Sequence, residues 1–300
     1  MPELPEVETL KRLLEPDLVG RRIDAARIDD PRLTAPVAPA EFADALVGER
    51  IETLSRRGKY LLIGLGSGRT LLVHLRMSGS LRHWPAGEPV NLGHLRAQLR
   101  LDDGSTLSYR DVRRFGTWRL LDAEELEAHL ASRLGPEPLA PGLRPRRLGE
   151  ALAGRRSSLK AALLDQRTLA GVGNIYADEA LWRARLHPRR EAGSLDAEEL
   201  GALYRGVRVA LRRGIALQGS TLRDYSLPDG ERGAMQHEFK VYGRAGEPCE
   251  RCGTAIEWIR LAGRGTSYCP SCQPLAPGRP AAAAPGRARH RRPLASRVGS

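Results

Sequence analysis

Four cysteines constrain this chain of 300 residues more than any other feature, because all of them lie in one stretch. Cys249 and Cys252 form one Cys-x-x-Cys pair, and Cys269 and Cys272 form a second, with sixteen residues between the pairs. Each pair can bind a metal ion from one turn, and two pairs make a closed tetrahedral site of four thiolates, which is typical of structural Zn²⁺. The sequence therefore predicts a small module built around one Zn²⁺, without an open coordination position for catalysis.

Two disulfides are the alternative for the same thiols, and they require an oxidising compartment. The N-terminal residues lack the basic and apolar regions of a secretion signal, and no apolar run is long enough to cross a membrane. We therefore expect reduced cysteines in a cytoplasmic protein. Between the cysteine pairs, 256–259 and 266–268 are predicted strands joined by 261–265, which makes a hairpin with Arg264 at its tip.

The net charge of the chain is +12 at pH 7, which suits a polyanionic partner such as nucleic acid. Residues 274–300 contain six arginines and no acid, so they supply half of that charge. Their Pro, Ala, Arg and Gly residues cannot bury apolar surface, and we expect this tail to be disordered. The charge alone therefore does not identify the partner.

The residues before the zinc module divide into two parts by their hydrophobic pattern. After Pro5, apolar residues at helical spacing predict a helix that ends at Gly20. From Arg22 to about Leu121, short β-like runs separated by turn signals predict a β-sandwich or barrel within a domain 1–133. The clearest runs are Ile51–Leu54, Tyr60–Leu65, Thr70–Leu75, Ala97–Leu101 and Thr106–Tyr109.

A segment rich in proline and basic residues, 134–148, is predicted to link this domain to a helical domain 149–240, which precedes the zinc module 241–273. The turn 171–174 (Gly-Val-Gly-Asn) either presents backbone N–H groups to a phosphate or simply joins two helices. The loop 221–236 has no periodicity and is either a lid or a solvated connection. The predicted helices are Ser158–Asp165, Ile175–Ala184 and Asp196–Leu217.

The first six residues, Met-Pro-Glu-Leu-Pro-Glu, allow two interpretations. They suit the start of a helix, where proline is favoured and acids complement the helix dipole. If Met1 is removed, however, Pro2 supplies a free secondary amine followed directly by the carboxylate of Glu3. An amine can act as a nucleophile and a carboxylate can move protons, so the same residues could form a catalytic site.

Several motifs then occur in a fixed order along the chain. They are MPELPEVE at the N-terminus, RRGKYLL at 56–62, HLRMSGSLR at 74–82, DVRRFG at 111–116, GVGNIYADE at 171–179 and VYGR at 241–244. Together they resemble the formamidopyrimidine-DNA glycosylase family of bacterial DNA repair enzymes, over about residues 1–273. The resemblance implies an α+β fold: an N-terminal helix with a β-sandwich, a helix-two-turn-helix domain and a C-terminal four-cysteine zinc hairpin.

The resemblance also implies a mechanism and its residues. Such an enzyme excises oxidised purines from damaged double-stranded DNA through a Schiff base on Pro2, and then cuts the strand by β- and δ-elimination. Glu3 would shuttle protons with support from Glu6. Lys59 would contact a phosphate and assist elimination, and Arg264 would contact the phosphates that flank the lesion.

Further matching positions imply contacts with DNA outside the reacting sugar. Met77, Arg113 and Phe115 match the residues that fill the gap left by a flipped nucleotide. The positions that match backbone contacts are His94, Arg113, Arg155, Lys160 and Asn174. Nothing in the sequence indicates an obligate oligomer or a membrane partner, so a monomer on DNA is the simplest expectation.

Three features depart from the family pattern. Arg76 stands where glycine usually precedes Met77, a second histidine is missing beside His94, and Ala234-Met235 replace common aromatic residues in the loop 221–236. That loop covers the flipped base in the family, so lesion preference is open. Two other functions also remain open: an endonuclease VIII-like glycosylase for oxidised pyrimidines, and a zinc-ribbon DNA-binding protein without catalysis.

Overall fold

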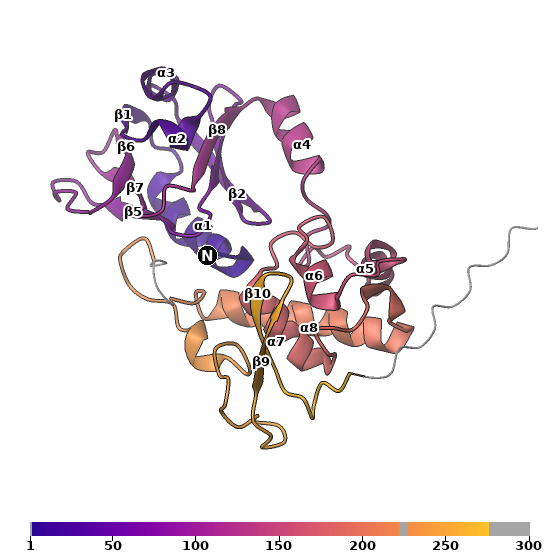
Figure 1. Ribbon diagram of the computed structural model, residues 1–300. Coiled ribbons are helices and arrows are strands. Elements are labelled where there is room, and N and C mark those ends of the chain that lie inside the picture. The colour runs from indigo at the N-terminus through magenta and orange to yellow at the C-terminus, as the bar shows by residue number, and fades with distance from the viewer. Residues whose placement is uncertain (1, 222–226, 276–300) are drawn as a thin grey trace, which may run out of the picture.

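The N-terminal domain is a sandwich of two four-stranded antiparallel sheets, in a computed structural model that describes residues 2–221 and 227–275. The sandwich that the strand pattern predicted is therefore confirmed (Figure 1). One sheet has the order β1-β6-β7-β5: Ile23–Ile28, Leu95–Leu101, Thr106–Asp111 and Gly79–Trp84. The other has the order β2-β3-β4-β8: Ile51–Arg57, Tyr60–Leu65, Thr70–His74 and Thr117–Leu121.

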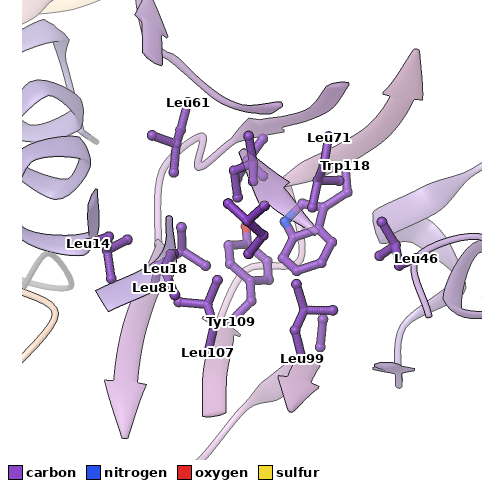
Figure 2. Packing of buried hydrophobic residues seen from close by; sticks show 14 of the residues in the cluster. Leu14, Leu18, Leu46, Leu61, Leu71, Leu81, Leu99, Leu107, Tyr109 and Trp118 are labelled. Atoms are coloured by element: carbon purple, nitrogen blue, oxygen red, sulfur yellow. The ribbon is translucent and has the colours of Figure 1, made fainter. Parts of the chain in front are cut away.

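The core of the sandwich lies between the inner faces of these sheets, where alternate residues of each strand point inward. Figure 2 shows Tyr109 and Trp118 among leucines from both sheets, and their ring centroids are 5.4 Å apart. Three short helices lie around the sheets: α2 (Pro31–Thr34), α3 (Pro39–Asp44) and α4 (Ala123–Ala131). The strand pattern missed β1, β5 and β8, whose sequences mix apolar with charged or small residues.

The first helix, α1 (Leu4–Leu18), belongs to both domains. Glu3 is its N-cap and forms a capping box with Glu6, and Pro5 lies in the first turn. Val7 and the leucines that follow it at helical spacing are buried in the sandwich core, whereas Leu4 is buried in the core of the helical domain. The predicted helix is thus confirmed, and it joins the two domains.

The helical domain packs α7 against α8, with α5 and α6 beside them (Figure 1). Its helices are α5 (Pro145–Leu152), α6 (Leu159–Leu164), α7 (Asn174–Ala184) and α8 (Ala197–Ala216), and the short 3₁₀ turns are η1 (Ala192–Ser194) and η2 (Met235–Glu238). The three predicted helices are found: α6 and α8 are one residue shorter at each end than predicted, and α7 begins one residue earlier. The segment 134–148, expected to be a linker throughout, contains the start of α5, because Pro145 suits the first helical turn and Leu148 is buried.

The C-terminal hairpin consists of β9 (Glu257–Leu261) and β10 (Arg264–Tyr268). Its turn is only Ala262-Gly263, both at positive φ, so the five-residue loop expected at 261–265 is wrong. Arg264 is the first residue of β10 and pairs with Leu261.

The described residues of the loop 221–236 are also more structured than the sequence suggested. Leu227 is buried in the sandwich core, and Met235 is buried in the helical-domain core. Residues 222–226 and the part of the predicted disordered tail from 276 onward lie outside the described residues. No helix in the described part of the chain could span a membrane.

Candidate active site

The N-terminal residues are buried where the sandwich meets the helical domain (Figure 1). The backbone N–H of Leu4 donates to the carbonyl of Gly171 at 3.0 Å. A Cβ atom on Gly171 would lie 2.6 Å from that of Leu4, and φ at Gly171 is +89°. The glycine turn therefore allows α1 to approach the helical domain closely and holds Pro2 and Glu3 in place.

The carboxylate of Glu3 sits on the N-terminus of α7. It accepts hydrogen bonds from the backbone N–H groups of Ile175 at 2.9 Å and Tyr176 at 3.4 Å. A Cβ on Gly173 would lie 2.3 Å from the Glu3 carboxyl carbon, so this position needs glycine. Burial raises the pKa of Glu3 against the attraction of Lys59, which favours a group that can hold a proton.

Glu6 fixes the geometry around Glu3. One of its oxygens accepts from the Glu3 backbone N–H at 2.9 Å. The other accepts from the Tyr176 hydroxyl at 2.8 Å and from the Ser220 N–H at 2.9 Å. Glu6 is 1% exposed, so its carboxylate links α1, α7 and the segment after α8 inside the protein.

Lys59 lies in the tight turn between β2 and β3, after Gly58 at positive φ, and is 7% exposed. Burial lowers the pKa of its ammonium group, Glu3 and Glu6 raise it, and Arg264 lowers it. These four side chains are therefore close enough to interact. The structure brings together the residues expected around Pro2, from three separate parts of the chain.

Lys160 does not face solvent, so its expected role in holding the DNA backbone is wrong. Its side chain is 0% exposed, and its ammonium lies 2.6 Å from an Asp178 carboxylate oxygen. It also donates to the Gly265 carbonyl at 2.9 Å and to the Thr266 hydroxyl at 2.8 Å. Lys160 therefore ties the start of β10 to the helical domain.

Replacing Lys160 by methionine should lower the melting temperature by about 6–20 °C. The change leaves the Asp178 carboxylate buried without its cation, which typically costs about 3–5 kcal/mol. As a matched control, Lys11→Met breaks a partly exposed pair with Glu15 on α1 and should shift melting by less than about 4 °C. Calorimetry of both variants tests this, and equal shifts would contradict the anchoring role.

Asn174 takes part in the same anchor. Its side-chain amide donates to the Gly265 carbonyl at 3.0 Å, while its Oδ1 is buried. The other oxygen of Asp178 accepts from the Ser267 N–H at 3.0 Å. These bonds fix β10 beside α7, and they hold the exposed Arg264 within electrostatic reach of the buried Lys59.

Met77, Arg113 and Phe115 lie on two neighbouring loops of the sandwich. Phe115 is 50% exposed, Met77 is partly exposed, and the Arg113 guanidinium lies 4.8 Å from the Phe115 ring centroid. The buried carboxylate of Asp111 joins the loops, since it accepts from the Ser78 hydroxyl at 2.6 Å and the Gly116 N–H at 2.8 Å. An exposed aromatic ring on a braced loop suits insertion into a base stack.

His94 and Arg155 are the remaining residues expected to contact the DNA backbone. His94 is exposed before β6 at positive φ, and its carbonyl accepts from the Asp111 N–H. Arg155 is half-buried, and it forms an ion pair with Asp165 at 2.8 Å. His94 is therefore available to a ligand as it stands, whereas Arg155 would share its charge with Asp165.

Sequence reasoning missed Asp111, Asp178, Glu179, Tyr176 and Ser220. Glu179 is 0% exposed, and one of its oxygens accepts from three successive backbone N–H groups at 240–242. Asp178 and Glu179 are adjacent acids in α7, whose other residues are mostly apolar. That pattern was a usable signal, because buried carboxylates need partners. Asp178 pairs with Lys160 on α6, and Glu179 pairs with Arg183 on its own helix.

The four cysteine sulfurs all lie within 4.8 Å of one another. Recorded S···S separations run from 3.4 to 3.9 Å, near the ~3.8 Å edge of a tetrahedron with Zn–S bonds of about 2.3 Å and well beyond a disulfide bond of about 2.05 Å. The Trp182 indole N–H donates to Cys249 Sγ at 3.4 Å, and such hydrogen bonds orient a thiolate that binds a metal ion. The donor set fits one structural Zn²⁺ and not disulfides.

Comparison with known proteins gives matches over most of the chain. The formamidopyrimidine-DNA glycosylase N-terminal domain matches residues 1–118, its H2TH domain matches 134–226, and the zinc finger found in FPG and IleRS matches 246–275. The formamidopyrimidine-DNA glycosylase of Roseiflexus sp. is 48% identical over 274 residues, which is 91% of this chain and 100% of that protein. The chain belongs to the formamidopyrimidine-DNA glycosylase family.

Other members of the glycosylase family support the same fold. The protein of Symbiobacterium thermophilum is 49% identical over 96% of this chain and 95% of its own length. A Lactococcus lactis FPG mutant in complex with DNA containing Fapy-dG is 40% identical, with a TM-score of 0.85 over 91% of this chain and 100% of that one. MutM in complex with DNA containing carbocyclic 8-oxo-G gives a TM-score of 0.84 at 39% identity, over 91% of this chain and 100% of that one. The resemblance expected from the sequence motifs is confirmed.

Proposed function

We propose that this protein is a bifunctional DNA glycosylase and AP lyase that excises oxidised purines, including 8-oxoguanine and formamidopyrimidines. The observation that carries the proposal is the buried Pro2-Glu3 pair at the N-terminus of α7, beside Lys59. Removal of Met1 would turn Pro2 into a secondary amine next to a carboxyl group with a raised pKa. The relatives named for formamidopyrimidine-DNA glycosylase and the structures with damaged DNA support this substrate class.

The chemistry begins at the sugar of a nucleotide flipped out of the duplex, since a stacked base is out of reach. The Pro2 nitrogen attacks C1′, a bond forms between them, and the glycosidic bond to the base breaks. The ring then opens to an iminium ion, which acidifies the proton on C2′. Loss of that proton expels the 3′ phosphate, and a second elimination expels the 5′ phosphate.

The surrounding side chains have separate tasks in this proposal. Glu3 moves protons at the sugar ring, and Glu6 keeps Glu3 in place. Lys59 and Arg264 bring positive charge to the phosphates that leave. Outside the pocket, Met77, Arg113 and Phe115 fill the gap in the base stack. The side chains of His94, Arg155 and Asn174 contact the DNA backbone and so fix the position of the protein on the duplex.

Replacing Glu3 by glutamine should lower the rate of base excision by about 10²–10⁴-fold and leave DNA affinity nearly unchanged. Because burial raises the pKa of Glu3 above 4.5, the wild-type pH–rate profile should contain a limb with its midpoint above that value. The limb should be absent in the variant. Single-turnover rates across pH measure this, with Glu15→Gln on the same helix as control. An unchanged profile would contradict the role of Glu3.

A panel of damaged duplexes tests the substrate class. We expect excision of 8-oxoguanine and formamidopyrimidines, and weaker action on thymine glycol. The reverse order would favour an endonuclease VIII-like enzyme, and no excision at all would favour a DNA-binding protein without catalysis. We further infer that the protein acts as a monomer in the cytoplasm, where bacterial DNA is found; sedimentation tests the monomer.

A further inference from the structure

A hollow of about 110 Å³ lies on the outer face of the sheet β2-β3-β4-β8, under the end of α4. Its floor is formed by the strands and its rim by basic side chains. The residues that line it are Tyr60, Leu72, Arg76, Thr117, Arg119, His129 and Arg133.

Strand register places this hollow at the end of the sheet that carries the proposed active site. Tyr60 pairs with His74, which in turn pairs with Thr117, so these residues form one row across β3, β4 and β8. Lys59 precedes Tyr60 in the chain, and Phe115-Gly116 precede Thr117. The hollow is therefore adjacent both to the catalytic lysine and to the loops that carry Met77 and Phe115.

The charge in the hollow is positive and is not neutralised. Three arginines and a histidine line it, and no lining residue is acidic. The guanidinium groups of Arg76 and Arg119 form no ion pair within the described residues, whereas many other arginines in the protein pair with a carboxylate. Arg133 donates to the carbonyl of His129 and to the Ser132 hydroxyl, so it too keeps its charge unpaired.

The side chains in the hollow repel one another. Burial and the nearby charges of Arg133 and Arg119 lower the pKa of His129. Arg76 is held at φ 53°, in the left-handed region that a residue other than glycine adopts only at a cost. A bound anion would offset the repulsion between the positive side chains.

We propose that the hollow binds one phosphodiester group of the DNA, on the backbone next to the damaged nucleotide. The proposal rests on the DNA-directed function inferred above and adds a contact that none of the expected DNA-binding residues provides. Arg119 and Arg133 would bind the phosphate oxygens from opposite sides, because they come from β8 and from the end of α4. Arg76 would bind the same phosphate from the loop that carries Met77.

Salt dependence of DNA binding tests the contact. Each phosphate that a protein neutralises adds about 1 to the slope of log affinity against log salt. The double variant Arg119→Gln/Arg133→Gln should therefore show a slope smaller by about 1 than the wild type, on damaged and undamaged duplexes alike. Arg119→Lys, which keeps the charge, should retain most of the slope. Arg100→Gln on β6, an exposed arginine at the far end of the other sheet, should leave it unchanged.

Neutral methylphosphonates identify the phosphate. They replace the phosphates around an abasic analogue one at a time. At one position the replacement should weaken DNA binding by the wild type, and it should not weaken DNA binding by the double variant any further. Equal slopes, or equal sensitivity at every position, would overturn the proposal. So would inorganic phosphate at constant ionic strength that binds the wild type but not the double variant and leaves the DNA affinity of the wild type unchanged, since the hollow would then hold free phosphate and no DNA.

These outcomes are separate from the proposed chemistry. Borohydride trapping of the protein on 8-oxoguanine DNA reports the Schiff base, and the slope on undamaged duplex reports the hollow. A wild-type protein that binds DNA without trapping would contradict the glycosylase function and leave the slope comparison valid. A wild-type protein that binds no DNA would overturn both.

Discussion

We expect one extra residue in front of Pro2 to abolish base excision and strand cutting. An added residue converts the Pro2 amine into an amide, whose nitrogen has no available lone pair for attack on C1′. The covalent adduct that borohydride traps on 8-oxoguanine DNA should therefore disappear, and Pro2→Gly should lose it as well. Denaturing gel electrophoresis of the trapped complex measures this.

DNA binding separates this effect from a folding defect. Pro2 precedes the first turn of α1, and the capping box between Glu3 and Glu6 does not depend on it. Affinity for a duplex with an abasic analogue should therefore stay within a few-fold of wild type. A control with the same residue added at the C-terminal end should retain full trapping. Full trapping by a protein whose Pro2 is blocked would contradict the assignment of Pro2 as the nucleophile.

Loss of zinc has the second large effect, because metal binding supplies the folding energy of the finger. Structural Zn²⁺ sites of this kind typically contribute about 10–16 kcal/mol near pH 7, so Cys269→Ser should leave 241–273 unfolded and open to protease. Arg264 and the Gly265 carbonyl then lose their fixed places beside Lys160 and Asn174. We expect a loss of strand cutting together with weaker DNA binding.

Ser271 provides a matched control for this experiment. It is exposed between Cys269 and Cys272 and is not among the four clustered sulfur ligands. Ser271→Ala should retain zinc, measured by a chromogenic chelator after denaturation, and should resist protease like the wild type. A Cys269→Ser protein that keeps a folded finger and a full equivalent of zinc would contradict the four-thiolate site.

The sequence predicted the parts of this protein whose patterns are local. The cysteine spacing, the helix after Pro5 and strands such as Tyr60–Leu65 follow from periodicity and turn residues, and the structure agrees with them. The short turn before Arg264 escaped prediction because Ala262 adopts positive φ without being glycine. Strand β1 escaped because only its first and last residues are buried.

Side-chain partners from distant parts of the chain could not be predicted from the sequence. Lys160 matches a position associated with DNA, yet its ammonium is buried against Asp178, and only the packing of β10 on α7 reveals this. The same holds for Glu6, whose partner Ser220 lies 214 residues away. Local patterns predict which residues are polar, but the fold decides which of them face solvent.

The position of α1 in both domain cores has a consequence for synthesis of the protein. A ribosome makes Pro2 and Glu3 first, but the partners that shape their surroundings are Lys59, Ile175, Ser220 and finally Arg264. The reactive end of a nascent chain therefore has no complete pocket until almost the whole described chain has been translated. In the proposed mechanism, an unfinished fragment therefore cannot cut DNA.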